Sequence, residues 1–242
     1  MSEIKTIGVL TSGGDAPGMN AAIRAVVRTA LYYGINVKGI LHGYNGLITD
    51  NVIDMDLRSV SNIIQRGGTM LFTARCKEFQ TEEGQQKAYE TCKKHGIDAL
   101  VVIGGDGSFR GCQAIAKKGI KCIGIPGTID NDIACSDYTI GYDTALNTSI
   151  QMCDRLRDTA RSHERCSVVE VMGRRAGYLA LNAGIAVGAT SILIPELDFD
   201  IEKDIIERMK RTQKTGKMHF IIVVAEGVNE KLEAQGINGV NA

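Results

Sequence analysis

The sequence predicts an α/β fold in which the strands of a parallel sheet alternate with helices. Short apolar runs of strand character alternate with longer stretches of helical character. The composition, 44% hydrophobic with 28 glycines, suits a chain with many strand-to-helix turns. Polar residues gather where the apolar runs end, which is where ligands bind in open parallel sheets.

The predicted elements follow one another along the whole chain. Apolar runs bounded by glycine, proline or polar residues predict the strands, and amphipathic stretches predict the helices. Strands are expected at residues 6–10, 36–41, 99–103, 121–125, 167–171, 191–194 and 220–225. Helices are expected at residues 19–33, 54–64, 82–95, 109–118, 142–163, 176–187 and 201–214. Residues 43–47 are expected to form a loop, and Gly96 is expected to cap the helix before it.

Length and charge narrow the classes of protein. A chain of 242 residues suits one large or two modest domains. Lys and Arg together number 28, and so do Asp and Glu, which gives a net charge of zero. No net electrostatic field therefore favours binding of nucleic acid or an anionic membrane. The start lacks the features of a signal peptide, and no apolar run reaches membrane-spanning length. Seven cysteines without a C-x-x-C pair indicate reduced thiols in the cytoplasm, not disulfides or a zinc site: Cys76, Cys92, Cys112, Cys122, Cys135, Cys153 and Cys166.

The chain is organised around residues 99–132, where two buried strands each end in a polar loop. In the first loop, Gly104, Gly105 and Gly107 let backbone N–H groups approach an anion, and the start of the next helix adds partial positive charge. Asp106 would repel a bare phosphate, but it suits a site where Mg²⁺ lies between carboxylate and phosphate. The first loop therefore predicts a magnesium–phosphate site.

The second loop supplies Thr128, Asp130 and Asp132. One carboxylate can serve the metal while the other takes a proton, and the hydroxyl can contact a phosphoryl oxygen. Phosphoryl transfer needs this combination of anion cradle, metal, base and cations. A lone Gly-Gly-Asp-Gly turn is ordinary turn chemistry, so the hypothesis depends on the pair of loops.

Several longer motifs accompany these loops. They are TSGGDAPGMNAAIR (residues 11–24), RGGT (66–69), TAR (73–75), GGDGS (104–108), PGTIDND (126–132) and VVEVMGR (168–174). Together they resemble the ATP-dependent 6-phosphofructokinases of bacteria over nearly the whole chain. NAD kinases and diacylglycerol kinases share a loop like GGDGS, whereas PGTIDND together with MGR is highly specific.

The resemblance implies two Rossmann-like three-layer lobes of the phosphofructokinase type, shortened at the C-terminus. An ATP-binding lobe would comprise residues 1–138 and a sugar-phosphate-binding lobe residues 139–242. The implied activity is phosphorylation of fructose 6-phosphate by ATP in glycolysis, with Mg²⁺ as cofactor. The implied assembly is a cytoplasmic homotetramer, with no nucleic-acid or membrane partner.

The resemblance also implies site residues. ATP binding falls to Gly14, Arg75, Cys76, Gly105, Asp106, Gly107 and Ser108, and metal binding to Asp106 and Asp132. Sugar-phosphate binding falls to Thr128, Asp130, Arg165, Met172, Gly173, Arg174 and Glu226, with Arg165 reaching a neighbouring subunit. Asp130 would be the catalytic base, while Thr128 and Arg174 would stabilise the phosphoryl group during its transfer.

An allosteric site for an ADP- or phosphoenolpyruvate-type effector is implied at Arg24, Arg28, Arg157 and Lys214. An acidic residue of some bacterial members appears here as Thr190. From the residues alone, Arg24 with Arg28, Arg75 and Glu226 are more typical of solvated surface groups. Gly13-Gly14 is equally typical of a plain turn.

Two glycines bear on the phosphoryl donor. Pyrophosphate-dependent relatives typically carry Asp in place of Gly107 and Lys in place of Gly127. Those larger, charged side chains would fill space that the α-phosphate of ATP needs. Glycine at both positions therefore favours ATP.

Members of the family continue beyond the end of this sequence with a His-Ile-Gln-Arg-Gly-Gly-like loop. We therefore expect either a fragment or a short member, with apolar surface left open. This motivates an alternative function, a non-catalytic or truncated nucleotide-binding subunit of the same family. A different kinase with a Gly-Gly-Asp loop, such as NAD kinase, is a third hypothesis.

Overall fold

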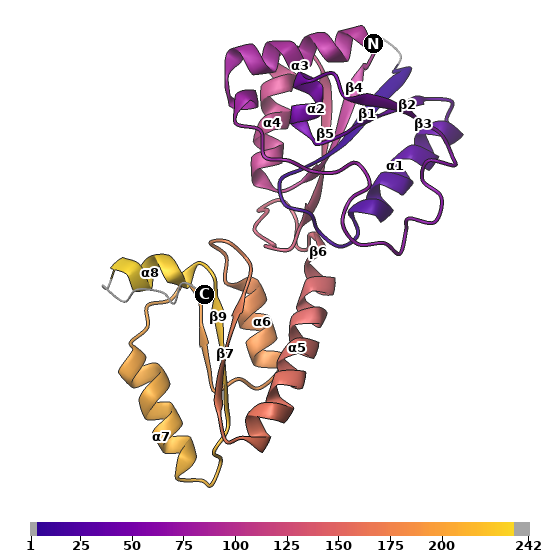
Figure 1. Cartoon of the computed structure of the whole chain (residues 1–242). Helices are drawn as coiled ribbons and strands as arrows, with labels where there is room; N and C mark the ends of the chain where they lie inside the picture. Colours follow the sequence, from indigo (N-terminus) through magenta and orange to yellow (C-terminus); the bar gives the residue numbers. More distant parts are fainter. Residues whose placement is uncertain (1–3, 235–242) are drawn as a thin grey trace. The chain divides into compact units, whose positions relative to one another are not determined.

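In a computed structural model, the structure is described for residues 4–234, and the chain divides into two compact units. The first unit contains residues up to Thr128 and residues Asp132–Gly141; the second contains Ile129–Asn131 and the residues from Tyr142 onward. Each unit has its own sheet (Figure 1). The end at residues 236–242, on which the expectation of a shortened C-terminus rests, lies outside the described residues.

The first unit is built on a six-stranded sheet in the order β3-β2-β1-β4-β5-β6. Every neighbouring pair is parallel except β2 with β3, which is antiparallel. The strands are β1 (Thr6–Ser12), β2 (Asn36–Ile40), β3 (Val52–Met55), β4 (Ala99–Gly104), β5 (Lys121–Thr128) and β6 (Ile140–Gly141).

Helices cover both faces of this sheet (Figure 1). Helix α1 (Met19–Tyr32) lies on one side, and α2 (Tyr44–Ile48), α3 (Glu82–Lys94) and α4 (Asp106–Lys117) lie on the other. The α4 side is a continuous apolar cluster in which Leu10, Leu100 and Val102 pack with Tyr44 and Ile115. Alternate strand residues thus bury opposite faces, as the two-residue period of a strand requires.

The strand order places a topological switch point between β1 and β4. From β1 the chain proceeds through α1 to β2 on one side, and from β4 it proceeds through α4 to β5 on the other. The two connecting helices leave toward opposite faces, and open sheets bind ligands at the carboxyl ends of the strands at such a point. The fold alone therefore marks these two loops as a ligand site.

The second unit has a three-stranded parallel sheet in the order β7-β9-β8. The strands are β7 (Cys166–Val171), β8 (Ser191–Leu193) and β9 (Phe220–Ala225); the helices are α5 (Tyr142–Ser162), α6 (Tyr178–Ala186), α7 (Glu207–Gln213), which extends a π-helical turn at Glu202–Ile206, and α8 (Val228–Ala234). All residues of β9 are buried. This continuous apolar run is typical of a central parallel strand covered on both faces.

Most predicted elements are confirmed, and the errors occur where glycine or weak periodicity misled the prediction. Residues 43–47 are not a loop, because α2 begins at Tyr44, whose ring stacks on Phe79 at 4.1 Å. The helix expected at residues 54–64 is absent: β3 ends at Met55 and turns follow. Pairing with β2 at the sheet edge takes Asp54 and Met55 out of the expected helix.

Two further boundaries differ from the prediction at the centre of the chain. Helix α4 begins at Asp106, not at residue 109, so Asp106 and Gly107 lie in its first turn. Strand β5 continues to Thr128 because its last residues pair with β6. Parts of both predicted polar loops therefore belong to regular elements: Asp106 and Gly107 to α4, and Pro126–Thr128 to β5.

Some strand side chains are exposed although they are apolar. Ile123 of β5 is 67% exposed and Val168 of β7 is 65% exposed. These two side chains leave apolar strand surface exposed to solvent. Among the described residues, no helix combines the length and the apolar character needed to cross a lipid bilayer.

Gly46 in α2 tests how closely the backbone packs in the first unit. A Cβ atom there would lie 1.9 Å from the carbonyl oxygen of Leu41, whereas a Cβ at Gly67 would meet nothing within 4 Å. We expect Gly46→Ala to lower the free energy of unfolding by about 3 kcal/mol or more, because backbone must shift. The matched Gly67→Ala should stay within about 1 kcal/mol of wild type. Urea unfolding measures both, and equal effects would contradict this account.

Candidate active site

One group of candidate site residues lies at the carboxyl ends of β1, β4 and β5 in the first unit. The sheet register pairs Ser12 with Gly104 and Gly104 with Pro126, so these strands end at nearly the same level. The hydroxyl of Ser108 donates a hydrogen bond of 2.9 Å to the carbonyl of Ser12. This hydrogen bond holds the first turn of α4 against the end of β1.

Gly104 makes this junction possible. A Cβ atom on Gly104 would lie 2.4 Å from the Ser108 hydroxyl and 2.5 Å from the Ser12 carbonyl oxygen. Gly105 precedes α4, and no side chain caps the helix, which leaves the first-turn amides of Asp106 and Gly107 directed outward. A helix start of this kind attracts anions through its amides and its dipole.

Ser108 itself is only 4% exposed. Its amide donates to the carbonyl of Gly105 at 3.0 Å, and its hydroxyl proton is committed to Ser12. Behind it, the buried hydroxyl of Tyr44 donates to the Ser108 carbonyl at 2.6 Å, and burial raises the pKa of Tyr44 far above its usual range. Ser108 therefore stabilises the turn between β4 and α4.

The loops after β1 and around Arg75 meet at the same edge. Thr73 donates its hydroxyl proton to the carbonyl of Gly13 at 2.7 Å, which brings the TAR motif beside the Gly13-Gly14 turn. Gly13 has a φ of 90°, in the left-handed region that favours glycine. Arg75 is exposed, while Cys76 is half-buried against the apolar cluster. Glycines and a cation expected at the nucleotide site thus share one edge.

The Asp106 carboxylate is paired in this structure with a residue that the sequence analysis missed. Arg110, one helical turn later on α4, lies 2.9 Å from Asp106, and both side chains are mostly exposed. The four-residue spacing on a helix is the signal that would have found it. Arg110 is therefore a cation that competes with any metal for Asp106.

The donor set fits Mg²⁺ only in an open arrangement. Within residues 4–234, no three His, Cys, Asp or Glu side chains gather where they would share a metal ion. Asp106 and Asp132 are exposed carboxylates of the first unit. Mg²⁺ is commonly held by one or two carboxylates together with substrate phosphates and waters, so these two residues suit a metal that arrives with its nucleotide.

The second loop passes from one unit to the other. Thr128 ends β5, and its side chain lies within 3.9 Å of the position that a Cβ atom on Gly105 would take. Asp130 follows as a half-buried residue in the segment that belongs to the second unit. Asn131 adopts a left-handed φ of 53°. A non-glycine residue in that conformation is enriched at functional sites.

A second group of candidate site residues lies at the carboxyl ends of β7 and β9 in the second unit. The amide of Glu226 donates to the carbonyl of Val171 at 2.9 Å, and a Cβ atom on Gly227 would lie 2.5 Å from the carbonyl of Arg174. The segment Met172–Arg174 and Glu226 are therefore neighbours. Arg174 is exposed with a left-handed φ of 55°. Of the residues expected to bind the sugar phosphate, the structure brings Met172, Gly173, Arg174 and Glu226 together.

Arg165 lies at the opposite end of the same sheet. It immediately precedes β7, and its carbonyl accepts a hydrogen bond of 3.0 Å from the amide of Phe220 at the start of β9. The six residues of β7 span roughly 20 Å at about 3.3 Å per residue. Arg165 is thus separated from Met172 and Glu226 within its own unit.

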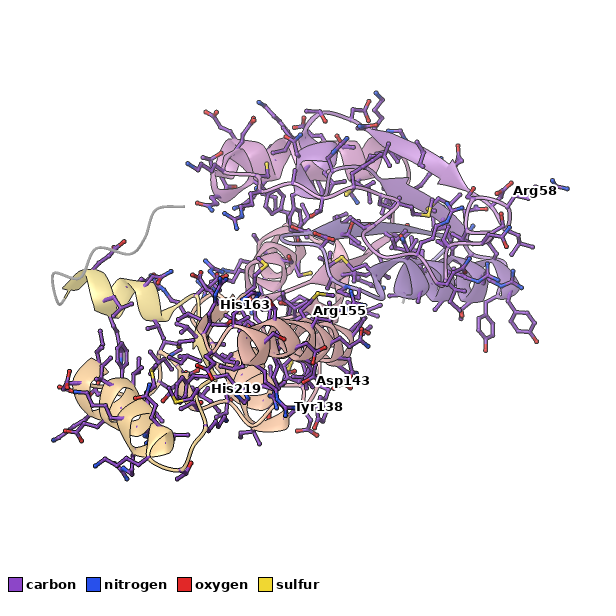
Figure 2. All side chains as sticks on the ribbon, turned by 60° about the horizontal axis from the view of Figure 1, so that its bottom comes forward. Arg58, Tyr138, Asp143, Arg155, His163 and His219 are labelled. Carbon is purple, nitrogen blue, oxygen red and sulfur yellow. The ribbon has the colours of Figure 1, made fainter. Side chains whose placement is uncertain are left out.

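The cations of the expected effector site are partly engaged. Arg24 donates to the carbonyl of Val60 at 2.5 Å, and the Arg157 guanidinium donates to the carbonyl of Val187. Arg28 and Lys214 are exposed. Arg155 on α5 is also exposed, and so is His163 just after the end of that helix (Figure 2).

Thr190 marks a feature that the sequence analysis did not find. It lines an open pocket of about 500 Å³ in the second unit. Its hydroxyl oxygen is buried without a hydrogen-bond partner in the described part of the chain. The pocket is also lined by Lys203, Arg208 and Arg211, with Asp204, Glu207 and Thr212. Three cations and two carboxylates thus line the pocket, and Arg208 lies 3.9 Å from Asp204.

Comparison with known proteins agrees with the motifs. A family described as phosphofructokinase matches residues 6–240. The ATP-dependent 6-phosphofructokinase of Thermoanaerobacter sp. (strain X514) is 61% identical over 226 residues, which are 93% of this chain and 70% of the relative. That of Halothermothrix orenii is 62% identical over 228 residues, 94% of this chain and 68% of the relative. The solved phosphofructokinase of Saccharomyces cerevisiae matches with a TM-score of 0.85 at 38% identity, over 96% of this chain and 36% of that one.

The ion pair of Asp106 with Arg110 generates a testable prediction. We expect Arg110→Ala to lower the Mg²⁺ concentration that half-saturates nucleotide binding by up to about fivefold, because an exposed pair of this kind contributes about 1 kcal/mol at most. Titration of nucleotide binding with MgCl₂ measures the effect. The matched Arg110→Lys keeps the charge and should change little. A higher Mg²⁺ requirement in Arg110→Ala would show that Arg110 assists the metal.

Proposed function

Because the chain belongs to the phosphofructokinase family, we propose that it transfers the γ-phosphoryl group of ATP to fructose 6-phosphate. The products are ADP and fructose 1,6-bisphosphate, and the step belongs to glycolysis. The observation that carries the proposal is the meeting of Gly13-Gly14, Gly104–Ser108 and the TAR motif at the switch point of the first sheet. Glycine-rich backbone, a helix start and Arg75 together suit a nucleotide triphosphate.

ATP binding falls to the first unit. The amides at the start of α4 and the backbone of Gly14 would contact the phosphates, and Gly105 lies beside Thr128. Arg75 would bridge ATP and the sugar phosphate, since a planar cation can hold two anions. Cys76 would contact the nucleotide from the edge of the apolar cluster.

Mg²⁺ would be held by Asp106, with Asp132 assisting. When bound, the ion supplies positive charge that neutralises the phosphates during transfer. Displacement of Arg110 from Asp106 would accompany its binding.

Transfer itself would use residues of the second loop and of the second unit. Asp130 takes the proton of the sugar 1-hydroxyl, whose oxygen forms the new bond to phosphorus while the bond to ADP breaks. Thr128 donates its hydroxyl proton to the phosphoryl group, and Arg174 neutralises its charge. Met172, Gly173 and Glu226 hold the sugar, an arrangement that the contact between their two loops supports.

Arg165 would act in a neighbouring subunit. Its separation from Met172 and Glu226 within its own unit supports binding of the sugar 6-phosphate in another copy of the chain. The assembly proposed is a homotetramer in the cytoplasm, where the seven cysteines remain reduced.

Regulation by an ADP- or phosphoenolpyruvate-type effector would involve Arg24, Arg28, Arg157 and Lys214. The pocket beside Thr190, with its three cations and two carboxylates, lies in the same unit as Arg157 and Lys214.

The experiment that tests the function is ADP formation by the purified 242-residue chain with Mg-ATP, with and without fructose 6-phosphate. Turnover that depends on the sugar phosphate supports the proposal. Mg-ATP binding without such turnover would favour a nucleotide-binding subunit instead. A panel that includes NAD and diacylglycerol tests the other kinase class, which the family match disfavours.

The role of Asp130 gives a prediction about turnover. We expect Asp130→Ser to reduce kcat by roughly 10²- to 10⁴-fold because the general base is lost, while the Kd for Mg-ATP stays within about twofold. Stopped-time ADP assays and calorimetry measure the two quantities. The exposed carboxylate of Asp154 on α5 provides the control, since Asp154→Asn should alter neither. Undiminished turnover in Asp130→Ser would rule out this base.

The choice of phosphoryl donor depends on two glycines in different surroundings. A Cβ atom at Gly107 would meet nothing within 4 Å, but one at Gly127 would lie 3.0 Å from the Ile103 side chain. Gly107→Asp should therefore fold normally and weaken Mg-ATP binding about tenfold or more, because a carboxylate replaces open space beside the phosphates. Gly127→Lys should also lower the thermal midpoint. Wild-type ATP affinity in Gly107→Asp would contradict this account of donor choice.

A further inference from the structure

The segment from Arg66 to Thr73 leads directly to Arg75 and contains neither helix nor strand. Its course is fixed by side chains of other segments. Asn20, in the first turn of α1 and 3% exposed, donates from its amide nitrogen to the carbonyls of Arg66 and Gly67, each at 3.1 Å. Its amide oxygen accepts a hydrogen bond of 2.7 Å from the amide of Met70. One buried side chain thus uses both donors and its acceptor on this segment.

A second anchor comes from the end of β1. The hydroxyl of Thr11, fully buried, donates to the carbonyl of Phe72 at 2.8 Å and lies 2.9 Å from the hydroxyl of Thr69. Because the single proton of Thr11 goes to Phe72, Thr69 must donate to Thr11. The two threonines form a short chain of hydrogen bonds whose members strengthen one another.

The anchored segment is strained. Phe72 adopts a left-handed φ of 56°, and its ring stacks on that of His42, which has a φ of 62°. The amide of His42 also donates to the carbonyl of Leu71 at 2.8 Å. Bulky residues persist in this conformation only where the surroundings hold them. Without its anchors, the segment would relax toward ordinary backbone angles.

The two anchors bracket the glycine turn of the candidate site. Thr11 lies just before Ser12 and Gly13 in the sequence, and Asn20 lies two residues after Gly18. Thr73, at the end of the anchored segment, donates a hydrogen bond from its hydroxyl to the Gly13 carbonyl. Arg75 comes two residues after that last bond. Its position relative to the Gly13-Gly14 backbone is thus set by the same hydrogen bonds that hold residues 66–73.

We propose that Asn20 and Thr11 are positioning residues, which act through Arg75 by holding residues 66–73 against the Gly13-Gly14 turn. The proposal rests on the proposed function in that Arg75 is taken to contact ATP. Neither Asn20 nor Thr11 need touch the nucleotide. Their loss weakens nucleotide binding because Arg75 no longer occupies one place when the ligand arrives.

The first test concerns the anchors alone and needs no ligand. Amide hydrogen exchange on the 242-residue chain should quicken at least tenfold in peptides covering residues 66–73 when Asn20 is changed to Ala. Asn20→Asp keeps the acceptor for Met70 and should quicken exchange less. Thr11→Val should act like Asn20→Ala, while Thr11→Ser keeps the hydroxyl and should restore protection. Unchanged exchange in Asn20→Ala and Thr11→Val would overturn the proposal.

The second test asks whether the anchors act through Arg75. Calorimetry gives the Kd for Mg-ATP of the wild type, Asn20→Ala, Arg75→Ala and the double variant. We expect about a tenfold loss for Asn20→Ala and little further loss when it is added to Arg75→Ala. An undiminished tenfold loss in the Arg75→Ala background would overturn action through Arg75. So would wild-type affinity in Arg75→Ala.

A matched variant separates positioning from simple destabilisation. Ser191 in the second unit is also 3% exposed, and its hydroxyl donates to the carbonyl of Asp204 at 2.6 Å. Ser191→Ala should lower the thermal midpoint without changing the Kd for Mg-ATP; an equal loss of affinity there would overturn the proposal. If the wild type bound no Mg-ATP, the proposed function would fail, and hydrogen exchange would still decide whether the anchors hold residues 66–73.

Discussion

The structure of the first unit depends on the close approach of three backbone segments: the end of β1, the end of β4 and the start of α4. Gly104 has no side chain, so the Ser108 hydroxyl reaches the carbonyl of Ser12, and α4 begins beside the end of β1. Any larger residue would separate these segments, since even a Cβ atom would lie 2.4 Å from the hydroxyl. The amides of the helix start, the Gly13-Gly14 turn and Thr128 are arranged around this contact. The site is thus a property of backbone packing before any charged group is considered.

A second constraint is that the two units present different chemical groups. The first unit offers glycine-rich backbone, a helix start and exposed carboxylates, which suit a magnesium nucleotide. The second offers Met172–Arg174 and Glu226 at the ends of two parallel strands, with Arg174 in a left-handed conformation. In both units the polar groups lie at carboxyl ends of strands, as expected for open parallel sheets. Arg165 is the exception, and its position at the opposite end explains why a neighbouring copy enters the proposal.

The sequence predicted the strands and helices that have strong patterns. The apolar runs of β1, β4 and β9 and the long amphipathic stretch of α5 left little ambiguity. It failed at α2, because two glycines imitate a loop while the stacking of Tyr44 on Phe79 is a tertiary contact. For the same reason the bonds of Asn20 to residues 66–70 were invisible, since they join segments more than forty positions apart. Arg110, by contrast, was detectable from its spacing to Asp106.

The proposed nucleotide site lies at the switch point of the first sheet. Hydrogen exchange of the 242-residue chain with and without Mg-ATP tests it most directly, because it reports where the ligand protects the backbone. We expect added protection in residues 13–18, 73–76 and 104–108, with little change at the opposite end of the same sheet. Saturating Mg-ATP that leaves these three segments unchanged, or protects other segments instead, would contradict this placement of the site.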